Sequence, residues 1–187
     1  EEIQKIAEAA KGTSFELPFL LAIWMGLRTS EIRGLTWDCI EGNMLHVKQA
    51  LVNSGDKGDV LKLTKTYSGD RKIRIPRDIK VLLDNCPHNT KYIVPCNRNS
   101  LYGQLSRLCQ KTGLPHYRFH DLRHVQASIM LALGVPDKYA MERMGHASTN
   151  MLKNVYQHTL KSKSDEVADT VDNFFSEKLH TDLHTNK

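Results

Sequence analysis

Residues 15–25 form the stretch that most restricts how this chain can fold. Apolar side chains occupy nearly every position here, on all sides of the helix that the pattern predicts. Such a helix is stable only when other parts of the protein surround it. The stretch is too short to cross a bilayer, and Arg28 follows soon after it. We therefore expect residues 15–25 to form a buried helix of a globular core, and we expect no membrane role.

Shorter amphipathic patterns surround this helix. Apolar residues recur at helical spacing in 2–11, 29–35, 78–83, 99–112, 120–133, 137–144, 148–156 and 164–179. Alternating residues predict strands at 44–51, 60–64 and 71–75, and the polar turn at 67–70 predicts that the last two strands pair as a hairpin. The expected fold class is α+β, predominantly helical, with a small three-stranded antiparallel sheet.

The composition fits one globular domain with an anionic partner. A chain of 187 residues with 40% hydrophobic residues is long enough for one substantial core. The net charge of +5 and the pI near 9.0 favour a negatively charged partner without requiring one. Four widely spaced cysteines without a C-x-x-C pair predict a reducing compartment and no disulfide framework. The chain begins at Glu1 within a helical pattern, so we expect it to be a fragment of a longer protein.

Six side chains, far apart in the sequence, have the chemistry that phosphodiester transfer needs. Such a reaction uses planar cations on the non-bridging oxygens, a nucleophile, and a proton donor for the leaving group. The stretch from 120 to 156 supplies a His-x-x-Arg pair, a Gly-His pair and a later tyrosine. The full set is Arg28, Lys65, His120, Arg123, His146 and Tyr156.

The motifs that hold these residues resemble, in order and spacing, the tyrosine recombinases of the phage integrase family. The matching segments are GLRTSE, LTKT, HDLRH, MGH and the tyrosine of the next helix. The resemblance implies that residues 1–163 are the catalytic domain of that family. It implies that residues 164–187 are a C-terminal helix and tail, which packs in cis or in trans. The family's N-terminal DNA-binding domains would lie outside this sequence.

The resemblance implies a site-specific DNA recombinase, an integrase that integrates or excises a mobile element. The hydroxyl of Tyr156 would attack a DNA phosphodiester and form a 3′-phosphotyrosine, without ATP, metal or any other cofactor. Arg28 and Arg123 would bind the non-bridging oxygens, which suit planar guanidiniums. His120 would bind the phosphate and assist removal of the tyrosine proton. The segments GLRTSEIRGLTWDCI and TKTYSGDRKIRIP look most like integrases of phages and conjugative transposons.

Three further roles come from the same resemblance. Lys65 would protonate the departing 5′ oxygen, which is a poor leaving group as an alkoxide. His146 would give the phosphate a further hydrogen bond, and Glu31 would support the arginine and histidine side chains from behind. The expected DNA-binding residues on the small basic sheet are Lys62, Arg71, Lys72 and Arg74.

Plainer interpretations of the same residues stay open at this point. Arg28 could merely cap the preceding helix and pair with Glu31, and Arg123 could be a structural arginine on a helix surface. Lys65 could be an ordinary basic strand residue. His120 and His124 could be half of a metal site, although no acidic or cysteine partner stands at ligand spacing. The tyrosines other than Tyr156 are interpreted as core residues: Tyr67, Tyr92, Tyr102, Tyr117 and Tyr139.

The expected partner is double-stranded DNA, bound by a homotetramer of the full-length protein, while the fragment alone could be monomeric. Accessory DNA-bending or excision proteins would assist, and the location would be the bacterial cytoplasm at the nucleoid. Two other functions share the scaffold: a type IB topoisomerase and a non-catalytic DNA-binding regulator. A nicking assay on a suicide substrate separates them.

Overall fold

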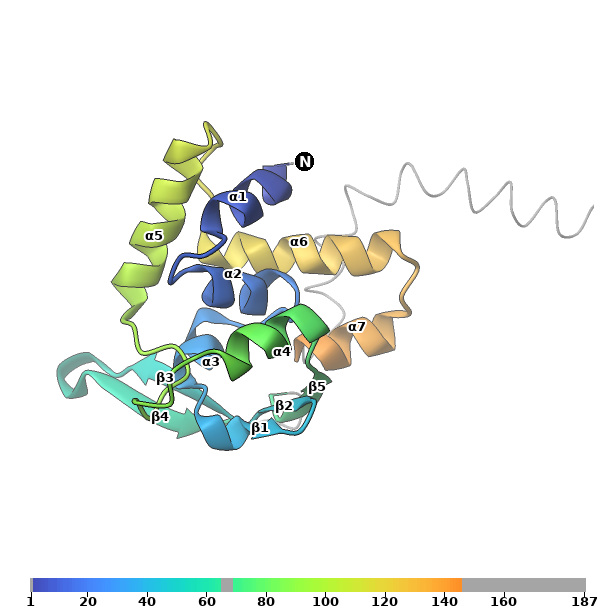
Figure 1. The fold of residues 1–187 in the computed structure, drawn as a ribbon. Coiled ribbons are helices and arrows are strands. Elements are labelled where there is room, and N and C mark those ends of the chain that lie inside the picture. Colours follow the sequence, from blue (N-terminus) through green and yellow to red (C-terminus); the bar gives the residue numbers. More distant parts are fainter. Residues whose placement is uncertain (1, 65–68, 146–187) are drawn as a thin grey trace, which may run out of the picture.

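Helices pack against a small group of strands that lie together at one end of the molecule (Figure 1). The computed structural model describes residues 2–64 and 69–145. Its helices are α1 (Glu2–Ala10), α2 (Glu16–Ile23), α3 (Thr29–Gly34), α4 (Arg77–Asp84), α5 (Arg98–Lys111), α6 (Phe119–Ala132) and α7 (Asp137–Met144). Its strands are β1 (Ile40–Glu41), β2 (Met44–Val47), β3 (Gln49–Asn53), β4 (Asp59–Leu63) and β5 (Arg71–Arg74), with 3-10 turns at Trp37–Cys39 and Gly55–Lys57. The α+β fold class, predominantly helical, is confirmed.

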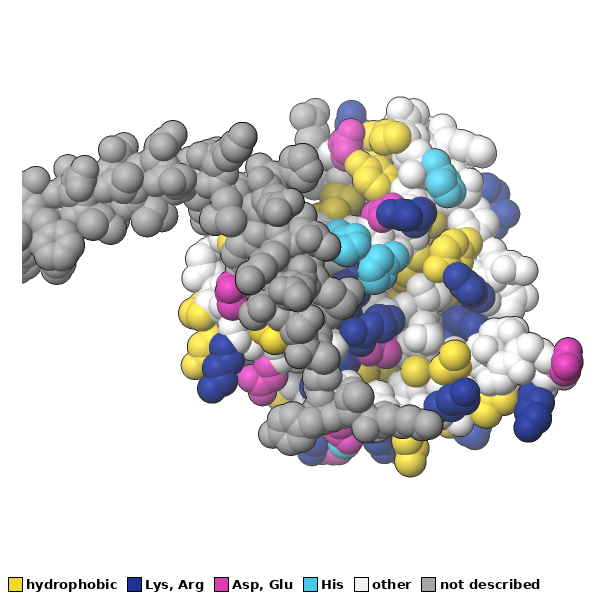
Figure 2. Space-filling model, turned by 180° about the vertical axis from the view of Figure 1, so that it is seen from behind, with side chains coloured by type: hydrophobic (Ala, Val, Ile, Leu, Met, Phe, Trp, Pro, Cys, Tyr) yellow, Lys and Arg dark blue, Asp and Glu magenta, His cyan; other side chains and the backbone are white. Residues whose placement is uncertain are grey.

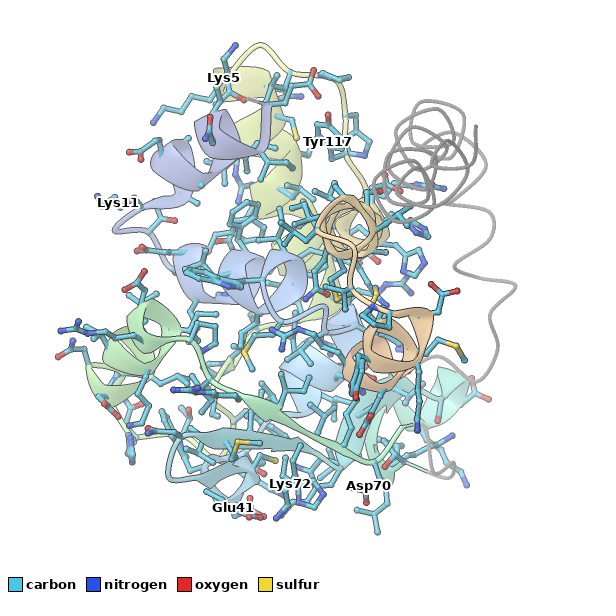
Figure 3. All side chains as sticks on the ribbon, turned by 90° about the vertical axis from the view of Figure 1, so that its right-hand side faces the viewer. Lys5, Lys11, Glu41, Asp70, Lys72 and Tyr117 are labelled. Atoms are coloured by element: carbon cyan, nitrogen blue, oxygen red, sulfur yellow. The ribbon has the colours of Figure 1, made fainter. Side chains whose placement is uncertain are left out.

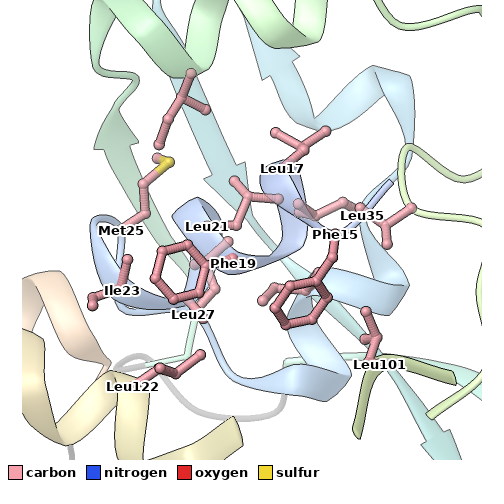
Figure 4. Packing of buried hydrophobic residues seen from close by; sticks show 14 of the residues in the cluster. Phe15, Leu17, Phe19, Leu21, Ile23, Met25, Leu27, Leu35, Leu101 and Leu122 are labelled. Atoms are coloured by element: carbon pink, nitrogen blue, oxygen red, sulfur yellow. The ribbon is translucent and has the colours of Figure 1, made fainter. Parts of the chain in front are cut away.

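Helix α2 is buried, as its apolar pattern predicts. Phe19 and Leu21 are almost fully excluded from solvent and lie in the main core (Figure 4). The ring of Phe15, just before α2, meets that of Phe119 at the start of α6 edge to face, with centroids 6.0 Å apart. Each fully buried side chain of this size contributes about 1.5–3 kcal/mol. This packing fixes the start of α6 against α2.

The strands pair differently from the prediction. The predicted strand at 44–51 is two strands, β2 and β3, with Lys48 between them. β2 lies between β1 and β5 in a three-stranded antiparallel sheet, while β3 and β4 form a separate two-stranded ribbon. The predicted hairpin between 60–64 and 71–75 is therefore wrong, because each of these strands pairs with an earlier part of the chain.

Burial explains this pairing. Leu45 faces Ile73 across the β2–β5 ladder, and both side chains are buried in the core. A hairpin of β5 with the largely exposed β4 would not cover this apolar face. The ribbon ends where Thr64 donates from its backbone N–H (2.9 Å) and its hydroxyl (3.1 Å) to the carbonyl of Lys48.

Helix α3 holds the β3–β4 ribbon closely. Gly34, its last residue, lies so near β3 that an added Cβ would be 2.8 Å from the backbone nitrogen of Leu51. The side-chain amide of Gln49 donates to the carbonyl of Gly34 at 2.8 Å. At the far end of β4 the buried guanidinium of Arg33 pairs with Asp59. The ribbon is thus fixed on α3 at several points.

The remaining boundaries agree closely with the predicted elements. α6 begins at Phe119 and α7 spans 137–144, and the segment 134–136 separates the two helices as predicted. In the segment 92–95, Tyr92 forms a single antiparallel bridge with Thr36. The four cysteines are free. No helix among the described residues is both long and apolar enough to span a membrane. The helices predicted at 148–156 and 164–179 lie outside the described residues.

Candidate active site

Three of the six predicted catalytic residues lie in the described part of the chain, and the fold places them close together. Arg28 stands at the junction of α2 and α3, while His120 and Arg123 are on the first turns of α6. The other three, Lys65, His146 and Tyr156, lie outside the described residues, as does the predicted tail 164–187.

Arg28 bonds to its own helix and to a distant one. The Glu31 carboxylate accepts from the backbone N–H of Arg28 at 2.8 Å and from its Nη1 at 2.7 Å. The other terminal nitrogen, Nη2, donates to the carbonyl of Gly145 at 2.9 Å, at the end of α7. Arg28 thus makes the local pair that the plainer interpretation expects, but it also reaches a residue 117 positions later. Its side chain remains about one-third exposed (35%).

Arg123 is buried between two helix ends rather than on a helix surface. Only 2% of it is exposed, and its two terminal nitrogens donate to the carbonyls of Gly26 and Met144, at the C-terminal ends of α2 and α7. Its Nε–H group makes no hydrogen bond to any residue that the structure describes. Burial and the nearby Arg28 lower the pKa of Arg123 to about 9, so the guanidinium is charged at neutral pH.

The turn after α2 is shaped to receive Arg123. Gly26 has a φ of +69°, a conformation that side chains with a Cβ rarely adopt. An added Cβ would also lie 1.9 Å from Oε1 of Gln126, which stands one helical turn after Arg123 on α6. The amide nitrogen of Gln126 donates to the carbonyl of Trp24 at 2.7 Å. Glycine at 26 therefore permits both the turn and the close approach of α6.

Three guanidiniums bind three consecutive carbonyls at the end of α7. Arg71 donates from Nε to the carbonyl of Arg143 at 2.9 Å, Arg123 donates to that of Met144, and Arg28 donates to that of Gly145. The last carbonyls of a helix lack partners within the helix and lie at its negative end, so cations are favourable there. The arrangement brings Arg28 and Arg123 together immediately before position 146.

His120 lies beside this arginine pair. Its ring meets that of His124 edge to face, with centroids 4.6 Å apart. Burial, followed by the neighbouring His124 and Arg123, lowers the pKa of His120 below its ordinary value of 6.5, which favours the neutral imidazole at pH 7. Figure 2 shows histidine side chains next to Lys and Arg side chains on this face. Within 2–64 and 69–145, no three His, Cys, Asp or Glu side chains are grouped as metal ligands would be.

Glu31 is the only carboxylate among the described residues with a direct contact to Arg28, and it is buried with 3% exposed. Both of its oxygens also accept from Arg71, at 3.1 and 3.0 Å. Burial alone would raise the pKa of Glu31, but the hydrogen bonds and charges of Arg71 and Arg28 lower it to about 2. The predicted support of the arginine therefore has a direct geometric basis. The predicted support of a histidine has no corresponding contact among the described residues.

Arg71 does not fit the predicted DNA-binding face. It is buried and bonded to Glu31, so its side chain is not on an exposed face of the sheet, and its contact with DNA stays a prediction. Alternation along β5 indicates the reason, since Arg71 shares its side of the strand with the buried Ile73 and Ile75. That alternation is a sequence signal from which the burial of Arg71 could have been inferred.

The other three predicted DNA-binding residues are exposed. Lys72 pairs with Glu41 at 2.5 Å on the outer side of the sheet, and Asp70 lies on the same side (Figure 3). This surface is therefore of mixed charge. Lys62 and Arg74 make no ion pair with a described residue, and Arg74 borders a shallow basic hollow that also includes Arg77, Lys80 and Arg143.

Comparisons with known proteins bear on the family and the fold of this chain. Residues 1–163 match the model of the phage integrase family. The chain is 26% identical, over an alignment of 208 positions, to a protein named tyrosine recombinase XerC-like from Caldanaerobacter subterraneus. The alignment covers 94% of this chain and 53% of that protein. It is 25% identical to the ICEBs1 integrase of Bacillus subtilis, with 84% and 48% covered. The chain thus spans about half the length of these relatives.

Solved structures show the same fold. The Tn1549 transposon integrase in complex with transposon right end DNA superposes with a TM-score of 0.72 at 20% identity, covering 88% of this chain and 64% of that one. A lambda integrase dimer bound to a core site gives 0.59 at 22% identity, with 82% and 56% covered.

Proposed function

We propose, from the fact that this chain belongs to the phage integrase family, that it breaks and rejoins DNA as a site-specific recombinase. Integration or excision of a mobile element is the role that we assign to it. The observation that carries the proposal is the placement of Arg28 and Arg123 on adjacent carbonyls of one helix end, beside the neutral His120. Two guanidiniums and an imidazole so placed suit one phosphate group.

The proposed reaction exchanges one phosphoester for another. The phenol oxygen of Tyr156 forms a bond to phosphorus while the bond to the 5′ oxygen breaks, which leaves a 3′-phosphotyrosine and a 5′-hydroxyl. A 5′-hydroxyl of the partner strand then attacks the phosphotyrosine and releases the phenol. The number of phosphoester bonds is conserved in each step, so no energy source is needed. Arg28 and Arg123 stabilise the charge on the non-bridging oxygens.

Protons move to and from defined atoms in this scheme. The neutral imidazole of His120 has a free lone pair, so it accepts the proton that Tyr156 loses. The ammonium of Lys65 donates a proton to the departing 5′ oxygen, and His146 donates a hydrogen bond to a phosphate oxygen. The lowered pKa of His120 supports the first assignment, because it keeps the ring unprotonated at neutral pH.

The assembly that we propose is a homotetramer on two DNA duplexes, with accessory DNA-bending or excision proteins, in the bacterial cytoplasm at the nucleoid. Residues 1–163 would form the catalytic domain, and 164–187 would pack in cis or in trans. The Tn1549 and lambda integrases, whose structures were solved in complex with DNA, support DNA as the partner. The net charge of +5 agrees with that choice.

A covalent-trapping experiment tests the function. The chain is mixed with a library of duplexes that carry a nick next to random sequence, so that cleavage releases a short strand and cannot reverse. We expect a denaturant-resistant DNA adduct with the unaltered chain, and none with Tyr156→Phe at nearly equal DNA binding. Adducts that persist in Tyr156→Phe, or an absence of adducts with the unaltered chain, would contradict the proposal.

The same protein and the trapped DNA sequences distinguish the recombinase from the two alternative functions. A type IB topoisomerase would relax supercoiled plasmid DNA without two matched sites, and a non-catalytic regulator would bind DNA without forming an adduct. We expect the trapped sequences to share a motif and plasmid relaxation to require that motif. Relaxation of plasmids without the motif would favour the topoisomerase.

A further inference from the structure

Arg71 is a buried arginine whose side chain joins three separate parts of the fold. Its Nε donates to the carbonyl of Arg143 on α7, and its terminal nitrogens donate to both oxygens of Glu31 on α3. Nη1 also lies 3.4 Å from the carbonyl of Gly69, the first described residue after the gap at 65–68. Arg71 opposes Val47 of the central strand β2, so its position is set by the sheet register.

Glu31 transmits the position of Arg71 to Arg28. The same two carboxylate oxygens that accept from Arg71 accept from the side chain and the backbone N–H of Arg28. A carboxylate held by a bidentate guanidinium on one side has little freedom to rotate. The orientation of the Arg28 guanidinium therefore depends on Arg71, although the structure shows no hydrogen bond between these two side chains.

Arg71 also fixes the end of α7 in register with the arginine pair. It binds the carbonyl of Arg143, and the next two carbonyls are bound by Arg123 and Arg28. If the end of α7 turned or moved, the acceptors of both Arg123 and Arg28 would move with it. Gly145, with a φ of +62°, ends the helix and carries the last of these three carbonyls.

We infer that Arg71 is a positioning residue for strand cleavage: it does not touch DNA, but it holds Glu31 and the end of α7 so that Arg28 and Arg123 face one phosphate. This inference rests on the proposed function. Its distinctive consequence is that Arg71 controls the rate of the chemical step without contributing to DNA affinity. A basic sheet residue that binds the DNA backbone would do the reverse.

Arg33 provides a matched control. Like Arg71, Arg33 is buried and bonds to both a carboxylate and a backbone carbonyl. It lies on α3, its carboxylate partner is Asp59, and its carbonyl partner is that of Cys96 at 3.3 Å. Asp59 is the first residue of β4, and Cys96 lies between α4 and α5. Neither of them contacts α7 or Arg28 through a described hydrogen bond. Arg33→Gln therefore removes a buried guanidinium without disturbing the arginine pair.

The test compares single-turnover cleavage of a nicked duplex by Arg71→Gln, Arg71→Lys and Arg33→Gln, with rates corrected for the folded fraction. We expect Arg71→Gln to cleave roughly 10- to 100-fold more slowly, by analogy with the loss of a partner that orients a metal ligand. DNA affinity should change by less than about threefold, because phosphate contacts set affinity. Arg71→Lys should recover only part of the rate, since one ammonium cannot bind both Glu31 oxygens and the α7 carbonyl.

A double variant guards against loss of folding. Arg71→Gln with Glu31→Gln leaves no unpaired buried carboxylate, so it should fold where the single variant does not. Its cleavage should remain slow, because Arg28 still lacks its anchored carboxylate. In Arg71→Gln alone, Glu31 faces only the cations Arg28 and Arg123, so its charge is lost more readily on acidification. The cleavage rate of Arg71→Gln should then fall more steeply below neutral pH than that of the unaltered chain.

The outcomes are distinct. Equal cleavage by Arg71→Gln and Arg33→Gln, while the unaltered chain forms adducts, rejects the role of Arg71 and leaves the proposed function in place. A parallel loss of DNA binding in Arg71→Gln also rejects it, because Arg71 would then act on affinity. No adduct from the unaltered chain rejects the proposed function and, with it, the role of Arg71 in cleavage.

Discussion

Arg28 and Arg123 donate hydrogen bonds to neighbouring carbonyls, those of Gly145 and Met144, although 95 positions separate them in the sequence. Two like charges are thus held near each other, and the effect is visible in the pKa of Arg123, which Arg28 helps to lower. The helix end and the carboxylate of Glu31 offset this repulsion. An anionic phosphate between the two guanidiniums would reduce it further, as expected of a prearranged anion site.

The buried carboxylate of Glu31 should make stability depend on pH in a specific range. Its pKa is about 2 in the folded chain and near 4.5 when unfolded, so its contribution is complete above pH 4.5 and is lost as the pH falls toward 2. The contribution is on the order of 3 kcal/mol. Urea unfolding of the unaltered chain and of Glu31→Gln should differ most at neutral pH. A difference that stays constant from pH 7 to pH 3 would contradict the assignment.

The contact of α3 with the β3–β4 ribbon should make alanine unfavourable at Gly34. Glycine to alanine in a helix usually stabilises by up to about 1 kcal/mol. A Cβ at Gly34 would lie 2.8 Å from the backbone nitrogen of Leu51, so we expect Gly34→Ala to destabilise by about 1–3 kcal/mol. Gly103→Ala in α5 is the matched control, because its nearest neighbour is the flexible end of Arg107 at 3.6 Å. Thermal unfolding should show opposite signs for the two variants, and equal signs would refute the close contact.

The imidazole of His120 should titrate below its ordinary pKa of 6.5. Burial disfavours its charged form, and the nearby His124 and Arg123 add positive charge. His124→Ala removes one of these two neighbours and should raise the pKa of His120. An NMR titration of the ring protons measures both values, with the histidines of other elements as internal references. A pKa of His120 at or above 6.5, or one that does not respond to His124→Ala, would contradict the geometry.

The helices were predictable from the sequence because their apolar spacing is local. The segment 137–144 carries a period that one helix face satisfies, the segment 15–25 is apolar on all sides, and glycine or proline marks several ends. Strand pairing was not predictable in the same way. The turn at 67–70 indicated a hairpin, but β5 pairs with β2 because only that partner buries Ile73 in the core.

The candidate site divides along the same line. Its residue types could be chosen from the sequence, since the motifs around Arg28 and Arg123 have the order and spacing of a known family. The role of Arg71 could not be predicted from the sequence in this way, because it depends on a carboxylate 40 positions earlier and a carbonyl 72 positions later. Arg71 lies two residues before Ile73 and so shares its side of the strand, which indicated burial. No neighbouring residue in the sequence indicated which groups Arg71 would bind.

The sequence by itself determined where the helices of the described residues form and which side chains have the chemistry to bind a phosphate, because helix periodicity and ionisable groups are properties of short segments. Only the tertiary structure decided that Arg28, Arg71 and Arg123 meet at the end of α7, and that Glu31 joins two of them. The physical reason is that burying β5 and α6 against the core brings distant guanidiniums to unpaired helix carbonyls, which must find donors once water is excluded.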